Sequence, residues 1–156
     1  MSAVPVSRPA LQLVRMQRAQ IPAVLAIENS LYPFPWTAGN FADSLSSAYE
    51  AWVLLDADEV AGYFLLMQVV DEAHLLNITV REDLQGGGLG RAMLDHAVSV
   101  AAALGTGSML LEVRPSNVRA KAIYERYGFV SIGRRMGYYP TAAEPREDAL
   151  MMRLAL

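Results

Sequence analysis

The segment from Val80 to Arg91 joins the end of an apolar run, a cluster of glycines and the start of an amphipathic pattern. Its letters are VREDLQGGGLGR, and four of them are glycine. Glycine lets a backbone approach a ligand closely and adopt positive φ, while free N–H groups at a helix start attract phosphate oxygens. The segment therefore predicts a site for an anion. A tight strand-to-helix connection that needs glycine only for packing fits the same letters.

Two familiar phosphate-binding fingerprints do not match this turn. A P-loop would end in Gly-Lys followed by Ser or Thr, whereas the chain has Gly90-Arg91 followed by alanine. The dinucleotide pattern GxGxxG starting at Gly86 needs glycine at position 91. What the turn does match is Q-x-x-G-x-G, formed by Gln85, Gly88 and Gly90. A nucleotide-binding protein is therefore disfavoured.

A second group of polar residues follows the turn. An apolar strand ends in Glu112, Asn117 opens the next helix, and Tyr124 lies within that helix. A carboxylate can act as a base, and a tyrosine, which is protonated near neutral pH, can donate a proton. The residues alone leave two other interpretations open: Glu112 as a surface or ion-paired carboxylate, and Tyr124 as a core residue. His74 and His96 are expected to be structural or solvent-facing.

Composition restricts the classes of protein that remain. A chain of 156 residues has the size of one domain, and its 53% hydrophobic and 19% charged residues predict a packed core. The absence of cysteine removes disulfides, zinc–thiolate sites and a cysteine nucleophile. Two isolated histidines do not suggest a metal site, so no metal is expected. A net charge of -3 argues against nucleic acid as a direct partner.

The chain also lacks a recognisable targeting segment. Its first residues contain no apolar core of the length that a secretory signal needs, and no apolar run approaches a membrane span. We therefore expect a soluble cytoplasmic protein without a membrane partner, present as a monomer or a weak homodimer.

The apolar pattern predicts a central sheet with helices on both faces. The final segment at 149–156 could be a helix by propensity, but its place after a turn-rich stretch favours a strand. A parallel strand–helix–strand crossover is expected over 73–113. The fold class is α/β (α+β mixed): one domain over 1–156, with 1–10 as a flexible N-terminal extension and a mixed, mostly antiparallel sheet of about seven strands flanked by about four helices. Strands are expected at 11–16, 51–55, 60–70, 73–80, 109–113, from 129 onward and at 149–156, and helices at 21–30, after Thr37, at 89–104 and at 117–127.

The turn and the segments after it resemble the GCN5-related N-acetyltransferase (GNAT) family. The matching features are the Q-x-x-G-x-G turn, Asn117 at a helix start, and Tyr124 four residues before a Gly-Phe pair. The letters PFPW at 33–36, LEVR at 111–114 and YYP at 138–140 resemble the RimI-type subgroup, whose members acetylate the N-terminal alanine of a small-subunit ribosomal protein. The resemblance covers roughly 11–156 and implies a GNAT-like fold.

The resemblance implies acetyl-CoA as co-substrate, a protein N-terminus as acceptor, and a role for each matching residue. The backbone of Ile78, Thr79 and Val80 would pair with the pantetheine arm, and Asn117 would contact the cofactor near its reactive end. Glu112 would be the general base and Tyr124 the general acid. Trp36 and Tyr139 are candidates for substrate contact, although packing explains them as well. The pyrophosphate would lie in the cradle of Gly86, Gly87, Gly88, Leu89, Gly90 and Arg91.

Three positions depart from the family pattern. Gly86 stands where a basic or polar residue is common, which leaves side-chain help for the phosphates to Arg91. Pro115 replaces a small residue and is expected to stiffen the turn after its strand. Gly137 looks inserted before Tyr138, which affects the register of the substrate-side loop.

Proton accounting favours an N-terminal amine as the acceptor. An α-amino group titrates near ~7.7–8.0 and a lysine near ~10.4, so neutralising lysine at pH 7 costs roughly 3.5 kcal/mol more. A single carboxylate suits the easier case, and direct attack on the thioester needs no cysteine. An enzyme of the same family acting on lysine side chains or a small amine stays an alternative, as does a non-catalytic acyl-CoA-binding module.

Overall fold

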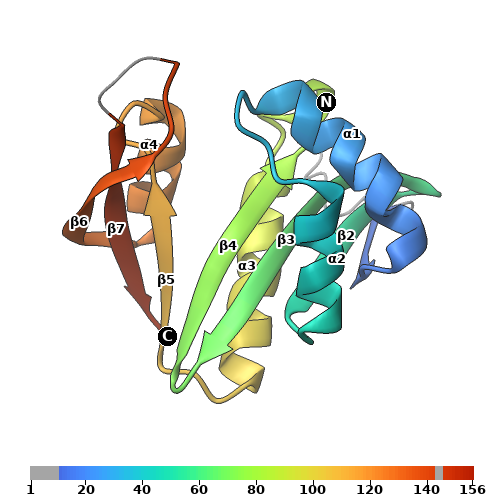
Figure 1. Ribbon diagram of the computed structural model, residues 1–156. Helices are drawn as coiled ribbons and strands as arrows, with labels where there is room; N and C mark the ends of the chain where they lie inside the picture. Colours follow the sequence, from blue (N-terminus) through green and yellow to red (C-terminus); the bar gives the residue numbers. More distant parts are fainter. Residues whose placement is uncertain (1–10, 143–145) are drawn as a thin grey trace. The chain divides into compact units, whose positions relative to one another are not determined.

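The computed structural model describes residues 11–142 and 146–156, and the strands of this part form one mixed sheet. The strands are β1 (Leu11–Arg15), β2 (Glu50–Asp56), β3 (Glu59–Val69), β4 (Glu72–Val80), β5 (Ser108–Val113), β6 (Val130–Tyr139) and β7 (Glu147–Ala155). Their order in the sheet is β1-β2-β3-β4-β5-β7-β6 (Figure 1). β4 pairs with β5 in parallel, whereas β1–β2, β2–β3, β5–β7 and β6–β7 are antiparallel. The seven-stranded, mostly antiparallel sheet is confirmed. The extension expected at 1–10 lies outside the described residues.

Four α-helices occur in the described part of the chain. They are α1 (Ile21–Leu31), α2 (Ala38–Ser46), α3 (Leu89–Ala103) and α4 (Val118–Tyr127), with short 3₁₀ turns η2 (Arg18–Gln20) and η3 (Glu82–Leu84). Thr37 caps α2 as expected, because its hydroxyl accepts the Asn40 N–H at 3.1 Å. Asn117 is the cap of α4 rather than its first residue, and accepts the Ala120 N–H at 3.2 Å. Gly128, at φ 122°, ends α4.

The chain divides into two compact units, and the first comprises the residues up to Met67 together with Leu75–Val100. In this unit α1 and α2 cover one face of the β2–β3 hairpin and α3 covers the other (Figure 1). The alternation along β3 explains the two layers: Tyr63 contacts Phe41 of α2 at 5.8 Å between ring centroids, while the next residue, Phe64, lies 6.0 Å from the ring of His96 on α3.

The second unit comprises Gln68–His74 and Ala101–Leu156. Here β5 pairs with β7 along its whole length, so that Glu112 lies opposite Met151. The strand expected from 129 onward is β6, which continues to Tyr139 and includes the exposed residues Arg134 and Arg135. The final segment is a strand, as expected, and the helical alternative for it is wrong.

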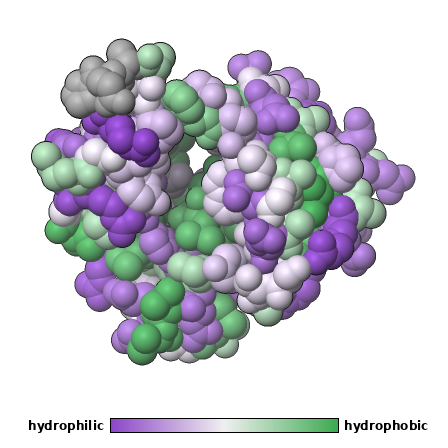
Figure 2. Space-filling view, in the orientation of Figure 1, coloured by the Kyte–Doolittle hydropathy of each residue, from purple (hydrophilic) through white to green (hydrophobic). Residues whose placement is uncertain are grey.

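No helix in the described part of the chain is long and apolar enough to cross a membrane. Polar and apolar side chains are interspersed over the visible face of the molecule (Figure 2).

Candidate active site

The glycine turn presents exposed backbone at the start of α3. Gly86 and Gly88 adopt φ of 84° and 89°, which L-residues avoid, and a side chain at Gly86 would meet nothing within 4 Å. The Gln85 amide donates to the carbonyl of Val80 at 2.9 Å and thereby ties the turn back to the end of β4. The first N–H groups of α3, which begins at Leu89, have no partner inside the helix. This geometry suits an anion with several oxygens.

Near the end of β4, the side chain of Thr79 is buried in the interior of the first unit. Thr79 is 2% exposed, and its hydroxyl contacts the Tyr32 hydroxyl at 2.8 Å and the Asn77 amide oxygen at 2.9 Å. Its neighbours Ile78 and Val80 are half-buried. The side chain of Thr79 is therefore committed to the interior, and what this residue can offer to a ligand is its backbone.

A buried carboxylate fixes the loop that carries Trp36. Glu28 of α1 is 2% exposed and accepts hydrogen bonds from the Tyr63 hydroxyl at 2.7 Å, the Asn77 amide at 3.1 Å and the Trp36 backbone N–H at 2.9 Å. Burial, followed by the hydrogen bond to Glu28, raises the pKa of Tyr63, which therefore remains a donor. The ring of Trp36 lies 5.1 Å from that of Phe41, so the indole is part of the packing of this layer.

Glu112 lies at the centre of a charged group in the second unit. Its side chain is 8% exposed, and Oε1 is 2.6 Å from Nε2 of His74 on β4. Oε2 lies 3.5 Å from Nη1 of Arg135 on β6. The hydrogen bond to His74, helped by the positive charge of Arg135, lowers the pKa of Glu112. Glu112 is thus an ionised carboxylate that is both buried and ion-paired. The ion-paired interpretation left open by the sequence is therefore confirmed, whereas the surface interpretation is wrong.

The two residues expected on α4 occupy different environments. Tyr124 is half-buried, and its ring packs edge-on against Phe129 at 5.7 Å. Asn117 is exposed, but its side-chain oxygen is used in capping the helix. Its NH₂ group is the part of the side chain suited to a ligand carbonyl.

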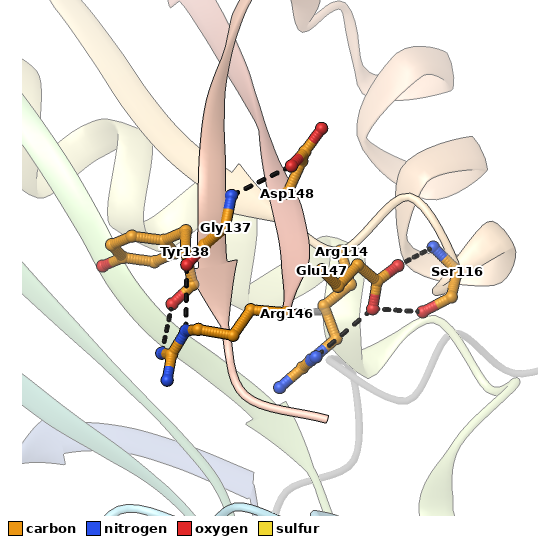
Figure 3. A network of polar contacts seen from close by, with 7 residues as sticks. All are labelled: Arg114, Ser116, Gly137, Tyr138, Arg146, Glu147 and Asp148. Carbon is orange, nitrogen blue, oxygen red and sulfur yellow. Dashed lines mark hydrogen bonds and ion pairs between the residues drawn. The ribbon is translucent and has the colours of Figure 1, made fainter. Parts of the chain in front are cut away.

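The start of β7 holds two turns of the second unit in place (Figure 3). Glu147 accepts from Arg114 at 3.2 Å and from the N–H and hydroxyl of Ser116 at 2.8 and 2.9 Å, which fixes the turn between β5 and α4. The Arg114 guanidinium also covers the Tyr139 ring at 4.4 Å. Tyr139 is therefore positioned by packing, and burial, with Glu112 nearby, raises its pKa.

A bulge in β6 accounts for the apparent insertion at Gly137. Between Arg135 and Tyr139 the register advances four steps on β6 against two on β7. Gly137 has φ 59°, and its N–H donates to Asp148 at 2.9 Å. Arg146 donates to the carbonyls of Gly137 and Tyr138 at 2.9 and 2.8 Å (Figure 3).

Each unit thus gathers part of the predicted site. The first contains the glycine turn, Ile78–Val80 and Trp36, and the second contains Glu112, Asn117, Tyr124 and Tyr139. Sequence reasoning did not identify the contact of His74 with Glu112, that of Glu28 with Trp36, or the bonds of Arg146 to Gly137 and Tyr138. A lone His in a strand or a Glu in an apolar helix face carries no local signal of its partner.

The sequence and fold were compared with known proteins. Residues 21–129 match the model of the Acetyltransferase (GNAT) family. The [ribosomal protein bS18]-alanine N-acetyltransferase of Escherichia coli K12 is 38% identical over 141 residues, which are 90% of this chain and 95% of the relative. The protein of the same name from Haemophilus influenzae is 32% identical over 126 residues, 81% of this chain and 86% of the relative.

Solved structures with a similar fold include the following two. The crystal structure of the ribosomal-protein-S18-alanine N-acetyltransferase from Escherichia coli has a TM-score of 0.85 at 36% identity and covers 93% of each chain. Ard1 from Thermoplasma volcanium has a TM-score of 0.87 at 25% identity, covering 94% of this chain and 98% of that one.

Proposed function

Because the chain belongs to the GNAT acetyltransferase family, we propose that it transfers the acetyl group of acetyl-CoA to the N-terminal alanine of ribosomal protein bS18. The observation that carries the proposal is the 38% identity to the Escherichia coli enzyme of that name, across 90% of this chain and 95% of the relative. A ribosomal-protein substrate also agrees with the cytoplasmic location expected from the sequence.

The glycine turn is the proposed site of the acetyl-CoA pyrophosphate. Its support is the exposed backbone from Gly86 to Gly88, the positive φ of two glycines, and the position of the turn at the start of α3, where a helix dipole favours negative charge. Arg91 on the first turn of α3 would add a positive charge. The backbone of Ile78–Val80 would pair with the pantetheine arm, and one of its N–H groups would meet the oxyanion of the tetrahedral intermediate.

Glu112 and Tyr124 are the proposed base and acid. Taking a proton from a free ammonium with pKa near ~7.7–8.0 would cost a carboxylate about 5 kcal/mol or more. That cost falls as the C–N bond forms, because the attacking nitrogen becomes far more acidic, and a water can carry the proton to Glu112. Tyr124 would protonate the departing thiolate, and because a phenol (pKa near ~10) is a weaker acid than a thiol (near ~8.5), this proton transfer costs roughly 2 kcal/mol. Asn117 would contact the cofactor, and Trp36 and Tyr139 the substrate.

The decisive experiment offers acetyl-CoA and three peptides to the purified protein. One peptide carries the free N-terminus of bS18, the second the same sequence with a blocked N-terminus and an internal lysine, and the third a different first residue. Mass spectrometry should find one added acetyl group on the first peptide only. Acetylation of the lysine peptide at an equal rate would replace the proposal by the lysine alternative, and no turnover on any amine would favour an acyl-CoA-binding module.

The Glu112→Gln variant tests the proposed base in the same assay. Removing a general base is expected to lower kcat by about 10²–10⁴-fold, since the amide cannot accept the proton. Glu125→Gln is the matched control, because Glu125 is 52% exposed and its ion pair among the described residues is with Lys121, one turn away. Equal rates for the wild type and Glu112→Gln would remove Glu112 from the mechanism.

A further inference from the structure

His74 reaches Glu112 across the parallel pair of β4 and β5. In the register His74 lies opposite Leu110, and Leu110 shares its face of β5 with Glu112 because alternate residues of a strand point the same way. The 2.6 Å between His74 Nε2 and Glu112 Oε1 requires a proton between the two atoms. With the carboxylate ionised, that proton belongs to the imidazole, so His74 donates and Glu112 accepts.

The other oxygen of Glu112 is left for a different donor. Oε2 is buried and has no hydrogen-bond partner in the described part of the chain. The Arg135 guanidinium at 3.5 Å supplies charge at a distance too long for a good hydrogen bond. A buried carboxylate oxygen without a donor is costly, and a substrate N–H or a water would relieve that cost.

We propose that His74 is a positioning residue for acetyl transfer, which holds Oε1 of Glu112 so that Oε2 faces the attacking amine. The inference rests on the proposed function and adds to it a residue outside the predicted site. Two protons leave the N-terminal ammonium as its nitrogen forms a bond to the thioester carbon and the C–S bond breaks. One proton passes by way of Oε2 to solvent, and the second also reaches solvent. Tyr124 gives its own proton to the thiolate and takes one back from solvent, so that one proton is released in net.

The groups that face Glu112 come from three elements besides its own strand, β4, β6 and β7. Arg135 of β6 keeps its charge at any accessible pH, and the residue opposite Glu112 on β7 is Met151. The hydroxyl of Tyr138 on β6 also faces Glu112, and burial, then the charge of Glu112 and a hydrogen bond to it, raises the pKa of Tyr138, which keeps that phenol neutral and able to donate. Burial has the same effect on Tyr139. Imidazole is the side chain whose charge ordinarily changes between pH 5 and 8.

The first test is the pH dependence of kcat/KM on the free bS18 peptide from pH 5.5 to 9. Protonation of the amine alone makes kcat/KM fall tenfold per pH unit in acid. A second proton on the His74–Glu112 pair weakens the carboxylate as an acceptor, so the wild type should fall more steeply, toward a hundredfold per unit. His74→Gln keeps a donor near the position of Nε2 but cannot titrate, and its fall should stay tenfold. His74→Ala should lose about ten- to hundredfold at pH 8, the size of one hydrogen bond to a charged group.

His96→Gln is the matched control, because the chain has 2 histidines and His96 lies in the first unit against Trp52 at 4.5 Å. In acid, the kcat/KM of His96→Gln should fall with pH as steeply as that of the wild type. Equal slopes for the wild type and His74→Gln, or an unchanged rate for His74→Ala, would overturn the inference.

The second test needs no turnover and so separates this inference from the proposed function. In ¹⁵N-labelled protein the His74 Nε2–H should give a ring N–H signal downfield of the backbone amides. It should disappear in His74→Gln, move upfield in Glu112→Gln, and stay in place in His96→Gln, while the amide spectrum reports that each variant is folded. Loss of peptide acetylation with this signal present would reject the proposed function alone. A signal indifferent to Glu112→Gln would reject the pairing itself.

Discussion

At the scale of single residues, the site depends on how one carboxylate is divided between two tasks. Glu112 gives one oxygen to His74 and leaves the other without a hydrogen-bond donor in the described part of the chain. The arrangement keeps the group ionised without satisfying it. An electrostatically held carboxylate of this kind has consequences for stability as well as for chemistry.

Glu112 should make folding stability depend on pH in the acid range. Its pKa is lowered in the folded protein by the His74 hydrogen bond, so the ionised form stabilises the fold above the unfolded-state pKa, near ~4.3, and this contribution is lost as pH falls through the folded value. The difference in unfolding free energy between wild type and Glu112→Gln should therefore stay constant above about pH 5 and shrink as the pH falls from about 5 toward 3. Urea denaturation at several pH values measures it, with Glu125→Gln as the exposed control. A difference that does not change with pH would contradict the prediction.

Tyr124→Phe should separate proton donation from packing. The variant keeps the ring that contacts Phe129 but loses the hydroxyl, so kcat should fall by about 10²-fold or more while CoA binding persists. Tyr127→Phe is the matched control, because that ring also contacts Phe129, at 6.1 Å, from the same helix. Steady-state kinetics and calorimetry provide the two readouts. Similar losses in both variants would assign Tyr124 to the core.

The residue types at the site could be predicted where the signal is local. Glu112 comes at the end of an apolar run and Tyr124 stands at a fixed spacing from a glycine, so both could be singled out from the sequence. His74 could not, because it meets Glu112 from 38 positions away through a strand pairing that only the folded sheet creates. Its interpretation as structural or solvent-facing missed this contact.

At the scale of elements, the loop between α1 and α2 is held by a carboxylate below it. Glu28 joins α1, β3, β4 and the Trp36 backbone through three hydrogen bonds in a place closed to solvent. Such a hub fixes the entry to α2 more firmly than the apolar contacts of the loop alone would.

Glu28→Ala should be strongly destabilising. It leaves the Tyr63 hydroxyl, the Asn77 amide and the Trp36 N–H without their acceptor, at a cost of about 2–5 kcal/mol. Chemical denaturation measures the loss, and Glu125→Ala provides an exposed glutamate for comparison. Glu28→Gln should cost less, because its amide oxygen still accepts. A loss below about 1 kcal/mol for Glu28→Ala would show that the network is replaced by water.

Most elements were predictable because their patterns are local and consistent. The Thr37 cap, the 57–58 hairpin turn and the helix ended near Gly105 all have residue types that specify them. The length of β6 was not predictable, since Arg134-Arg135 and Gly137 interrupt its pattern. Its pairing with β7 and the contacts of Arg146 and Asp148 impose a strand there.

At the scale of the whole molecule, CoA should stabilise the folded chain. A ligand that binds only the native state adds about 2.7 kcal/mol at a hundred times its Kd. The Tm should therefore rise with CoA concentration, as followed by differential scanning fluorimetry. Gly86→Ala should weaken the effect, because its φ of 84° disfavours a side chain. A Tm that is insensitive to millimolar CoA would remove the glycine turn as a diphosphate site.

The outer strand of the sheet also bears on how the protein behaves in a crowded solution. β6 ends the strand order and exposes Val130, Ile132 and Met136, at 60%, 51% and 78%. A straight edge strand with exposed apolar side chains can pair with a strand from another molecule. The two extra residues beside Gly137 bend the edge and spoil the ladder that a newcomer would need. Deleting Gly137 would therefore be expected to cost solubility before it costs the fold, a change that light scattering would register as aggregation.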